Sequence, residues 1–233
     1  MKKTLRYAIK HSSPIFISFI PVALAYGVLM QNAGYNFIWT GACSLFVLAG
    51  SLQYLMMTFF AGGVSLITVA VMALLLNSRH IFYGLSFIEK FRSFGPWKYF
   101  LIYSLTDENY SLHCSHDFPE GINEKWAYIL TAALTVAYWV ILSILGALIG
   151  TVIPFDTTGI DFALTALFIV ILIEQIKTAD NRLPAWIGGI SSIVCILIFG
   201  AANFILPALV ITVALLSILR SRIEPKTERE GMK

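Results

Sequence analysis

Two groups of charged side chains stand directly beside long apolar stretches, where charges are costly. Arg79 follows the apolar run 69–76, and two acids, Asp107 and Glu108, close the aromatic stretch 99–105. An arginine at membrane depth generally faces a cavity and a partner, and these acids are its natural partners. A carboxylate partly removed from water holds its proton more tightly, whereas a nearby guanidinium favours proton release. This opposition predicts a proton-sensitive coupling site at Asp107 and Glu108.

Each group of charges also has a simpler interpretation without a coupling role, and the sequence does not decide between the two interpretations. Arg79 could lie near the membrane surface, with its side chain reaching out to water. Asp107 and Glu108 could be ordinary acids at the start of a helix, where they satisfy free backbone N–H groups.

Polar residues around Arg79 fall on one side of a predicted helix. Tyr83 lies four residues after Arg79, and Asn77 and His80 lie three residues apart beside them. Such spacings place side chains on a shared helical face. Gln53, in the middle of another apolar stretch, could hydrogen-bond either a substrate or a neighbouring helix. The predicted substrate and translocation residues are Gln53, Asn77, Arg79, His80, Tyr83 and Thr106.

Other kinds of site are poorly supported by the spacing of reactive side chains. Segment 113–117 contains two histidines, a cysteine and an aspartate, but it is too cramped to wrap a tetrahedral metal, so we expect no metal. Ser51, after Gly50, is the one hint of an intramembrane serine site, and no G-x-S-x-G elbow occurs. No G-x-x-x-x-G-K-[ST] phosphate loop occurs either. We expect no cofactor and no ATP hydrolysis, and a membrane-embedded enzyme is the alternative to a transporter.

The composition requires a membrane rather than water around most of the chain. Of 233 residues, 58% are hydrophobic and 12% are charged, with a mean hydropathy of +0.79, whereas soluble domains carry about 25% charged residues. No acidic residue, lysine or arginine occurs between Lys10 and Arg79, and a helix needs about 20 apolar residues to cross a bilayer. Aliphatic runs without alternating polarity favour helices over a barrel. We predict a single polytopic all-α membrane domain over residues 1–233.

The apolar runs predict about eight transmembrane helices, or seven if one stretch is not a crossing. The spans cover residues 14–30, 37–60, 64–88, 98–113, 126–150, 161–177, 184–200 and 203–219. Several are short or interrupted, and helix breaks are predicted at Pro21, Gly27 and Gly50. Backbone freed by a break is tolerated only beside protein or a water-filled cavity. Broken helices often build the substrate site of a transporter near the membrane midplane.

Two related halves are suggested near residues 7–113 and 126–219. In each, a long first span and a polar turn precede an apolar span that ends near a glutamine, and secondary transporters are often built from repeats. Basic residues flank both ends of the chain, which predicts cytoplasmic termini. Eight simple crossings would then place the basic loop 90–98 outside. Either this loop is an exception, or one span between residues 37 and 88 is re-entrant.

Neither nucleic acid nor a disulfide framework is expected. The net charge of +3 comes mostly from the two chain ends, and a nucleic-acid role would need a basic patch on a folded face. The cysteines Cys43, Cys114 and Cys195 are odd in number and widely spaced. The basic start followed by an apolar run is typical of a signal peptide, but it contains prolines and precedes many more spans. We therefore expect it to be a retained first helix.

Several short motifs, taken in order, are similar to those of one known family. They are Pro21 followed by Gly27, the stretch Ala49-Gly50-Ser51-Leu52-Gln53-Tyr54, Leu76-Asn77-Ser78-Arg79-His80, Tyr83-Gly84, Leu105-Thr106-Asp107-Glu108, and Asp161-Phe162-Ala163-Leu164. In this order and at these intervals, they resemble the AzlC family, the large subunits of bacterial branched-chain amino acid exporters. The resemblance covers nearly the whole chain.

The resemblance implies a bacterial plasma-membrane permease that exports leucine, isoleucine, valine and related small neutral amino acids. Because the sequence contains no nucleotide-binding motif, a proton is the simplest coupling ion for such export. It also implies a small, separately encoded hydrophobic partner of the AzlD type. The chain departs from the family at Glu174, where a proline usually precedes the glutamine that ends the sixth span. This departure puts the local helix end, or the substrate, in doubt. A non-transporting membrane scaffold is the third interpretation.

Overall fold

The structure is a computed structural model in which all regular elements of the described residues are α-helices. It describes residues 1–152, 169, 172–173, 176–177, 182–200 and 204–219. Most of the predicted span 161–177, with Asp161 and Glu174, lies outside these residues. The chain forms two compact units, residues 1–63 with 77–161, and residues 64–76 with 162–233. These units are interleaved in sequence.

The first unit holds most of the described helices. They are α1 (Lys2–Asn32), α2 (Phe37–Phe46), α3 (Gly50–Gly62), α5 (Arg79–Arg92), α6 (Trp97–Tyr103), α7 (Asp107–Cys114) and α8 (Glu124–Val152). The second unit contains α4 (Leu66–Asn77) except for its last residue, which belongs to the first unit. It also contains α10 (Leu183–Phe199) and α11 (Ile205–Ile218). In that unit α10 packs against α11.

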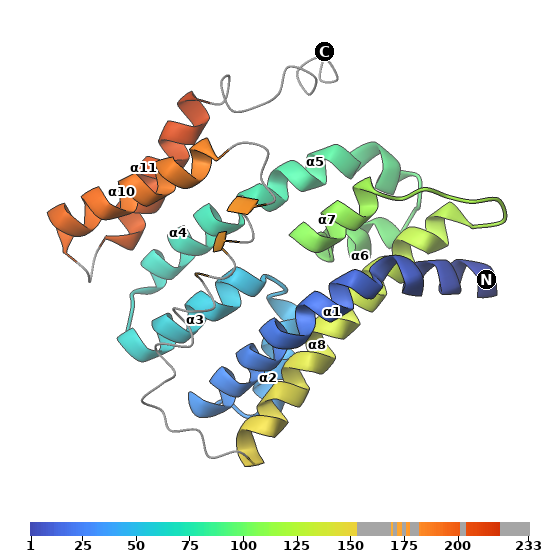
Figure 1. Cartoon of the computed structure of the whole chain (residues 1–233), viewed down its shortest axis with the longest axis horizontal. Helices are drawn as coiled ribbons and strands as arrows, with labels where there is room; N and C mark the ends of the chain where they lie inside the picture. Colours follow the sequence, from blue (N-terminus) through green and yellow to red (C-terminus); the bar gives the residue numbers. More distant parts are fainter. Residues whose placement is uncertain (153–168, 170–171, 174–175, 178–181, 201–203, 220–233) are drawn as a thin grey trace. The chain divides into compact units, whose positions relative to one another are not determined.

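The two long helices α1 and α8 lie side by side and form the centre of the first unit (Figure 1). They run parallel, because Thr4 contacts Asn123 near their starts and Gly150 lies against Gln31 near their ends. The end at which both helices begin is called the amino end of this unit, and the opposite end the carboxyl end. Both helices are long and apolar enough to cross a membrane.

Backbones of α1 and α8 touch at one crossing point, to which each helix contributes a glycine. A Cβ atom on Gly27 would lie 2.0 Å from the carbonyl oxygen of Ser143, and one on Gly146 would lie 2.2 Å from that of Leu24. Small residues permit such an approach between membrane helices. The predicted breaks at Pro21 and Gly27 are wrong, because α1 continues as one helix through both. Gly27 allows α8 to pack closely against α1. Pro21 can lie within the helix, because a proline in a membrane helix is tolerated where neighbouring groups satisfy the freed backbone.

Helices α2 and α3 form a hairpin that starts at the carboxyl end of the first unit, runs toward the middle of the unit and then turns back. The chain leaves helical geometry at residues 47–49, where Leu48 adopts a left-handed φ of 40°, an uncommon conformation for a residue with a side chain. After this turn α3 begins at Gly50. It returns to the carboxyl end, because the ring of Phe60 lies 4.8 Å from that of Tyr35, just before α2.

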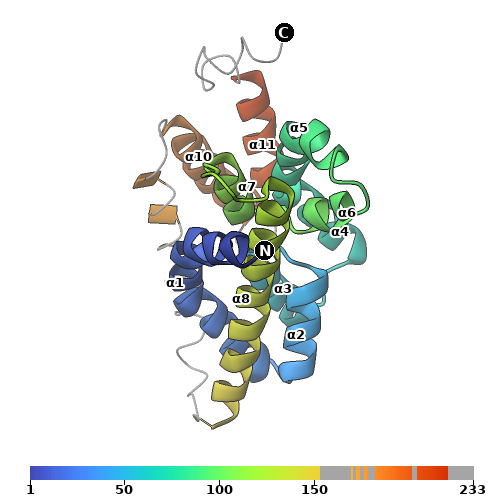
Figure 2. The same cartoon turned by 90° about the vertical axis from the view of Figure 1, so that its right-hand side faces the viewer.

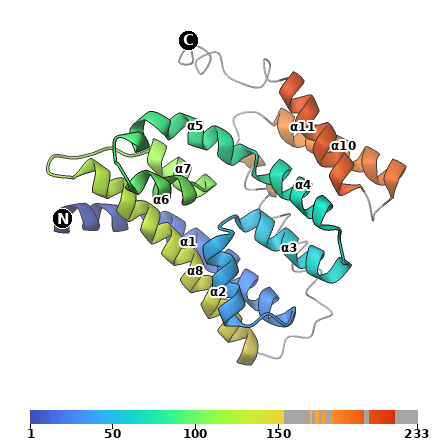
Figure 3. The same ribbon diagram turned by 180° about the vertical axis from the view of Figure 1, so that it is seen from behind.

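A second hairpin, α6–α7, enters from the amino end. The ring of Trp97, at the start of α6, lies 5.5 Å from that of Trp126 in the first turn of α8. The chain leaves helical geometry at residues 104–106. α7 then returns, and the ring of His113 near its end lies 4.9 Å from that of Tyr128. Figures 2 and 3 show the consequence: α6 lies beside the early part of α8, and α2 beside its later part.

An aromatic core at the amino end holds α5, α6 and α8 together. Its buried members are Phe87, Phe91, Phe94, Leu101, Leu105, Tyr128, Ile129 and Ala132. Lys90 of α5 also pairs with Glu124 of α8, so the basic loop 90–98 lies at the same end as the N-terminus. Segment 37–62 returns to the end of the unit from which it starts, so it is a hairpin in this structure.

The described helices support an all-α membrane protein without confirming eight crossings. Among them, only α1 and α8 have the length and apolar composition of a full span, and α2, α4, α10 and α11 contain shorter apolar helices. The predicted spans 37–60 and 98–113 are hairpins broken in the middle. The predicted span 64–88 is divided at Ser78, between α4 and α5.

Candidate functional site

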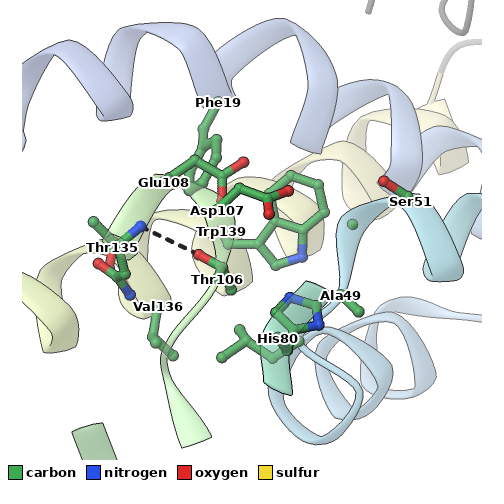
Figure 4. Close-up of a pocket in the computed structure, with 13 residues that line it drawn as sticks. Phe19, Ala49, Ser51, His80, Thr106, Asp107, Glu108, Thr135, Val136 and Trp139 are labelled. Carbon is green, nitrogen blue, oxygen red and sulfur yellow. Dashed lines mark hydrogen bonds between the residues drawn. The ribbon is translucent and has the colours of Figure 1, made fainter. Parts of the chain in front are cut away.

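The tips of the two hairpins meet at a pocket near the middle of the long helices. The pocket has a volume of about 60 Å³, room for roughly four or five water molecules. Its walls are Phe19 of α1 and Thr135, Val136 and Trp139 of α8. The hairpin tips contribute Leu48, Ala49, Gly50 and Ser51 on one side and Thr106, Asp107, Glu108 and Asn109 on the other, and α5 contributes His80 (Figure 4).

Both hairpins bring the N-terminus of their second arm to this pocket. α3 begins at Gly50 and α7 begins at Asp107, so the positive ends of two helix dipoles border the cavity. At α7 the side chain of Thr106 accepts a hydrogen bond from the backbone N–H of Asn109, at 3.4 Å (Figure 4). At α3 the residue before the helix is Ala49, which has no polar side chain with which to cap it.

Two carboxylates share the pocket with these helix ends and with apolar walls. Asp107 and Glu108 lie in the first turn of α7, where the helix dipole favours negative charge. The rings of Phe19 and Trp139 lie 5.1 Å apart and close one side of the cavity. Taken together, these groups can hold a small ligand that carries a cation, an anion and an apolar part.

Of the residues predicted from sequence, the structure brings four side chains together in this pocket. They are His80, Thr106, Asp107 and Glu108, and Gly50, the predicted break, begins the helix beside them. Gln53 lies behind Trp139 instead of lining the cavity, and it is fully buried. There it bonds α2 and α8 at once, through the carbonyl oxygen of Cys43 and the indole N–H of Trp139.

The remaining predicted residues lie outside the pocket lining. Asn77 ends α4, and Tyr83 stacks its ring on Tyr110 at 4.4 Å, with the ring of His80 5.8 Å away. Arg79 begins α5, and its side chain lies outside the described part of the structure. The pairing of Arg79 with the two acids therefore stays a prediction.

Six residues of the pocket were not predicted from the sequence: Phe19, Leu48, Asn109, Thr135, Val136 and Trp139. A signal for two of them was present. Thr135 and Trp139 are four residues apart in α8, so they share a face, and they follow Thr131 at the same spacing. In a helix of predominantly apolar residues, a face that carries hydroxyl and indole groups indicates a buried polar surface.

Three histidines gather at the amino end, away from the pocket. The ring of His116 lies 4.4 Å from that of His11 and 5.5 Å from that of His113, and its Nδ1 lies 3.1 Å from the hydroxyl of Tyr7. Burial, followed by the nearby His11, lowers the pKa of His116 to about 3, so this ring is neutral at physiological pH. Within the described ranges, no group of three or more His, Cys, Asp or Glu residues is placed to hold a metal ion.

Comparison with known proteins points to the same part of the chain. The family model described as "AzlC protein" matches residues 14–153, more than half of the sequence. The chain belongs to the AzlC family. The matched range contains both hairpins and every residue that lines the pocket, so the pocket lies within the part that defines the AzlC family.

Relatives in this family are membrane and transport proteins. The "Branched-chain amino acid transport protein AzlC" of Bacillus subtilis (strain 168) is 32% identical over 219 residues, covering 94% of this chain and 86% of its own. An "Uncharacterized membrane protein" of Helicobacter pylori (strain ATCC 700392 / 26695) is 33% identical over 223 residues, covering 95% and 97%. The "Inner membrane protein YgaZ" of Escherichia coli (strain K12) is 26% identical over 186 residues, covering 74% and 73%. No solved structure matches the chain.

Proposed function

We propose that this AzlC-family protein is a secondary transporter that exports branched-chain and related small neutral amino acids. The observation that carries the proposal is the pocket at which two hairpins, entering from opposite ends, meet between two long helices. In transporters, broken helices near the midplane bind substrate while access alternates between the two sides. The name of the Bacillus relative, a branched-chain amino acid transport protein, supports the substrate class.

The chemistry of the pocket suits a neutral amino acid. The substrate's carboxylate can lie at the start of α3, where backbone N–H groups and the helix dipole favour an anion. Its ammonium group can lie at Asp107 or Glu108, and a branched apolar side chain can pack on Phe19, Val136 and Trp139. Each part of such a zwitterion then meets a group of matching character among the pocket residues.

Coupling to protons is the simplest energy source for this transporter. The sequence carries no phosphate-binding loop, and export against a gradient requires an input of free energy. Acidic residues inside membrane proteins commonly act as proton relays. Asp107 and Glu108 line the pocket itself, so a proton and the substrate would exchange at the same place.

The charge distribution supports a cytoplasmic amino end in the bacterial plasma membrane. The basic residues 2–10 and the loop 90–98 lie at this end, whereas the turns at residues 33–36 and 62–65, which connect α2 and α3 to their neighbours in sequence, carry no charge. Cytoplasmic loops carry an excess of lysine and arginine. The basic residues after Leu219 support a cytoplasmic C-terminus as well. Substrate would then enter past α6–α7 and leave past α2–α3.

We expect export to require a small hydrophobic partner of the AzlD type, because short and interrupted helices leave backbone groups to be satisfied by protein. The test is efflux of labelled leucine from loaded cells that express this chain, its genomic neighbour, both or neither. Efflux should accelerate severalfold only in cells with both proteins. Full efflux from this chain alone in a strain lacking any such partner would refute the partner, and background efflux in all four strains would refute the transport function.

A pair of matched variants on α8 connects the efflux to the pocket. Val136→Phe fills the cavity and should reduce efflux to background, whereas Ile141→Phe places the same aromatic ring on the exposed side of the helix and should not. Ser51→Ala distinguishes transport from enzyme chemistry, because a serine nucleophile is indispensable to a serine enzyme. Retained efflux in Ser51→Ala supports a transporter.

A further inference from the structure

Gln53 ties the tip of the α2–α3 hairpin to α8. Its amide nitrogen donates to the carbonyl oxygen of Cys43 in the last turn of α2, at 2.9 Å, and its amide oxygen accepts from the indole N–H of Trp139, at 2.8 Å. The indole can only donate and the carbonyl can only accept, which fixes the orientation of the amide. The side chain is completely buried, with 0% of its surface exposed.

Asn109 does the same for the tip of the α6–α7 hairpin. Its amide nitrogen donates to the carbonyl oxygen of Ser104, the residue that directly follows α6, at 2.5 Å, and its amide oxygen accepts from the hydroxyl of Thr135, at 2.6 Å. Asn109 is also buried, with 1% of its surface exposed. Within the first unit, each hairpin therefore has one carboxamide that bridges its two arms and reaches α8.

The two carboxamides occupy equivalent places in two hairpins that approach the pocket from opposite ends of the unit. Each lies in the first turn of the second arm of its hairpin, at α3 or α7. Their partners on α8, Thr135 and Trp139, are one helical turn apart and both line the pocket. One hairpin lies between the pocket and the carboxyl end, and the other lies between the pocket and the amino end. Releasing either carboxamide from α8 frees a different tip.

We propose that Gln53 and Asn109 are paired latches, each holding one hairpin tip against α8, and that their release opens the pocket to opposite sides of the membrane. The proposal rests on the proposed function for the role of the pocket, and adds which residues control each side. Gln53 controls access from the carboxyl end, and Asn109 controls access from the amino end. Both are positioning residues, because they act through the hairpins and need not touch the substrate.

A single cysteine in the pocket tests this directly. Val136→Cys is placed in a background in which Cys43, Cys114 and Cys195 are alanine, and a membrane-impermeant thiol reagent is added to vesicles of either orientation. Asn109→Leu, which keeps the side-chain size but removes both hydrogen bonds, should raise the labelling rate from the amino side about fivefold, as expected when an internal hydrogen bond is lost. Gln53→Leu should raise it to the same extent from the carboxyl side.

Two more conservative substitutions on α8 disturb the fold less and test the same assignment of each latch to one side of the membrane. Thr135→Val removes the hydroxyl that donates to Asn109 with almost no change of shape, and Trp139→Phe removes the indole N–H that donates to Gln53. Each should shift labelling toward the side of its own latch, by less than the leucine variants. Labelling that rises equally from both sides, rises on the same side for both latches, or stays unchanged in folded variants would overturn the proposal.

The readout needs no substrate, so its failure is distinct from failure of the proposed function. If each variant is labelled from its predicted side but no amino acid efflux occurs, the latches are supported and the proposed substrate is refuted. Efflux without sided labelling would retain the transporter and reject the latches.

Discussion

Asp107→Asn should abolish transport driven by an imposed proton gradient and spare the exchange of substrate across the membrane. Exchange needs no net movement of protons, whereas gradient-driven transport needs a group that binds and releases one in each cycle. Acidic residues inside membrane proteins commonly act as proton relays, and Asp107 borders the pocket beside Trp139 (Figure 4). Glu108→Gln should have a milder effect of the same kind.

Flux of labelled leucine or valine into proteoliposomes, with and without a pH gradient, measures both activities. We expect gradient-driven flux of Asp107→Asn at background and exchange near that of the wild type. Glu120→Gln, which neutralises an exposed acid in the loop between α7 and α8, is the matched control and should leave both unchanged. If the single variants and the double variant of Asp107 and Glu108 all keep full gradient-driven flux, the two acids only cap α7 and coupling lies elsewhere.

Gly27→Ala should prevent α1 and α8 from packing as they do. The added Cβ would lie 2.0 Å from the carbonyl oxygen of Ser143 and 2.5 Å from the backbone nitrogen of Ala147, and neither backbone atom can move without moving α8. Overpacking typically costs about 1–3 kcal/mol, and we expect the upper end of that range, about 3 kcal/mol, for a clash with backbone. Purified protein should melt at clearly lower temperature, and the yield of folded protein should fall.

Gly84→Ala is the control for this experiment. Gly84 lies within α5, and an added Cβ would meet no atom within 4 Å. Because alanine is the better helix former, this change should be neutral or slightly stabilising. Equal melting temperatures for Gly27→Ala and the wild type would show that the two helices do not approach as closely as described.

The broken character of the helices could be predicted from sequence, but the paths of the broken segments could not. Gly50 was recognised as a point where an apolar run is interrupted, and it borders the pocket. An interruption alone does not distinguish a kinked crossing from a hairpin that turns back. Only contacts distant in sequence, such as that between Tyr35 and Phe60, reveal the direction of the second arm.

The errors at Pro21 and Gly27 have the same origin. Glycine and proline weaken a helix locally, so a sequence indicates a break at each. Gly27 is required instead by a neighbour more than a hundred positions away, because Ser143 leaves no room for a Cβ atom. Asn109 was missed for a related reason. Because it follows two acids, its position in the sequence indicates only the first turn of a helix, and its partner Thr135 lies on another helix.

If this protein transports as proposed, a branched-chain amino acid binds in the pocket between the two hairpin tips. Protection of a pocket cysteine by substrate tests it most directly, with Val136→Cys in the background without native cysteines and Ile141→Cys on the exposed side of α8 as the control. We predict that leucine, valine and isoleucine slow thiol labelling at position 136 in a saturable way, that lysine and glutamate do not, and that labelling at position 141 is unaffected. Equal labelling at position 136 with and without saturating leucine, in vesicles that still transport leucine, would show that the substrate does not bind in this pocket.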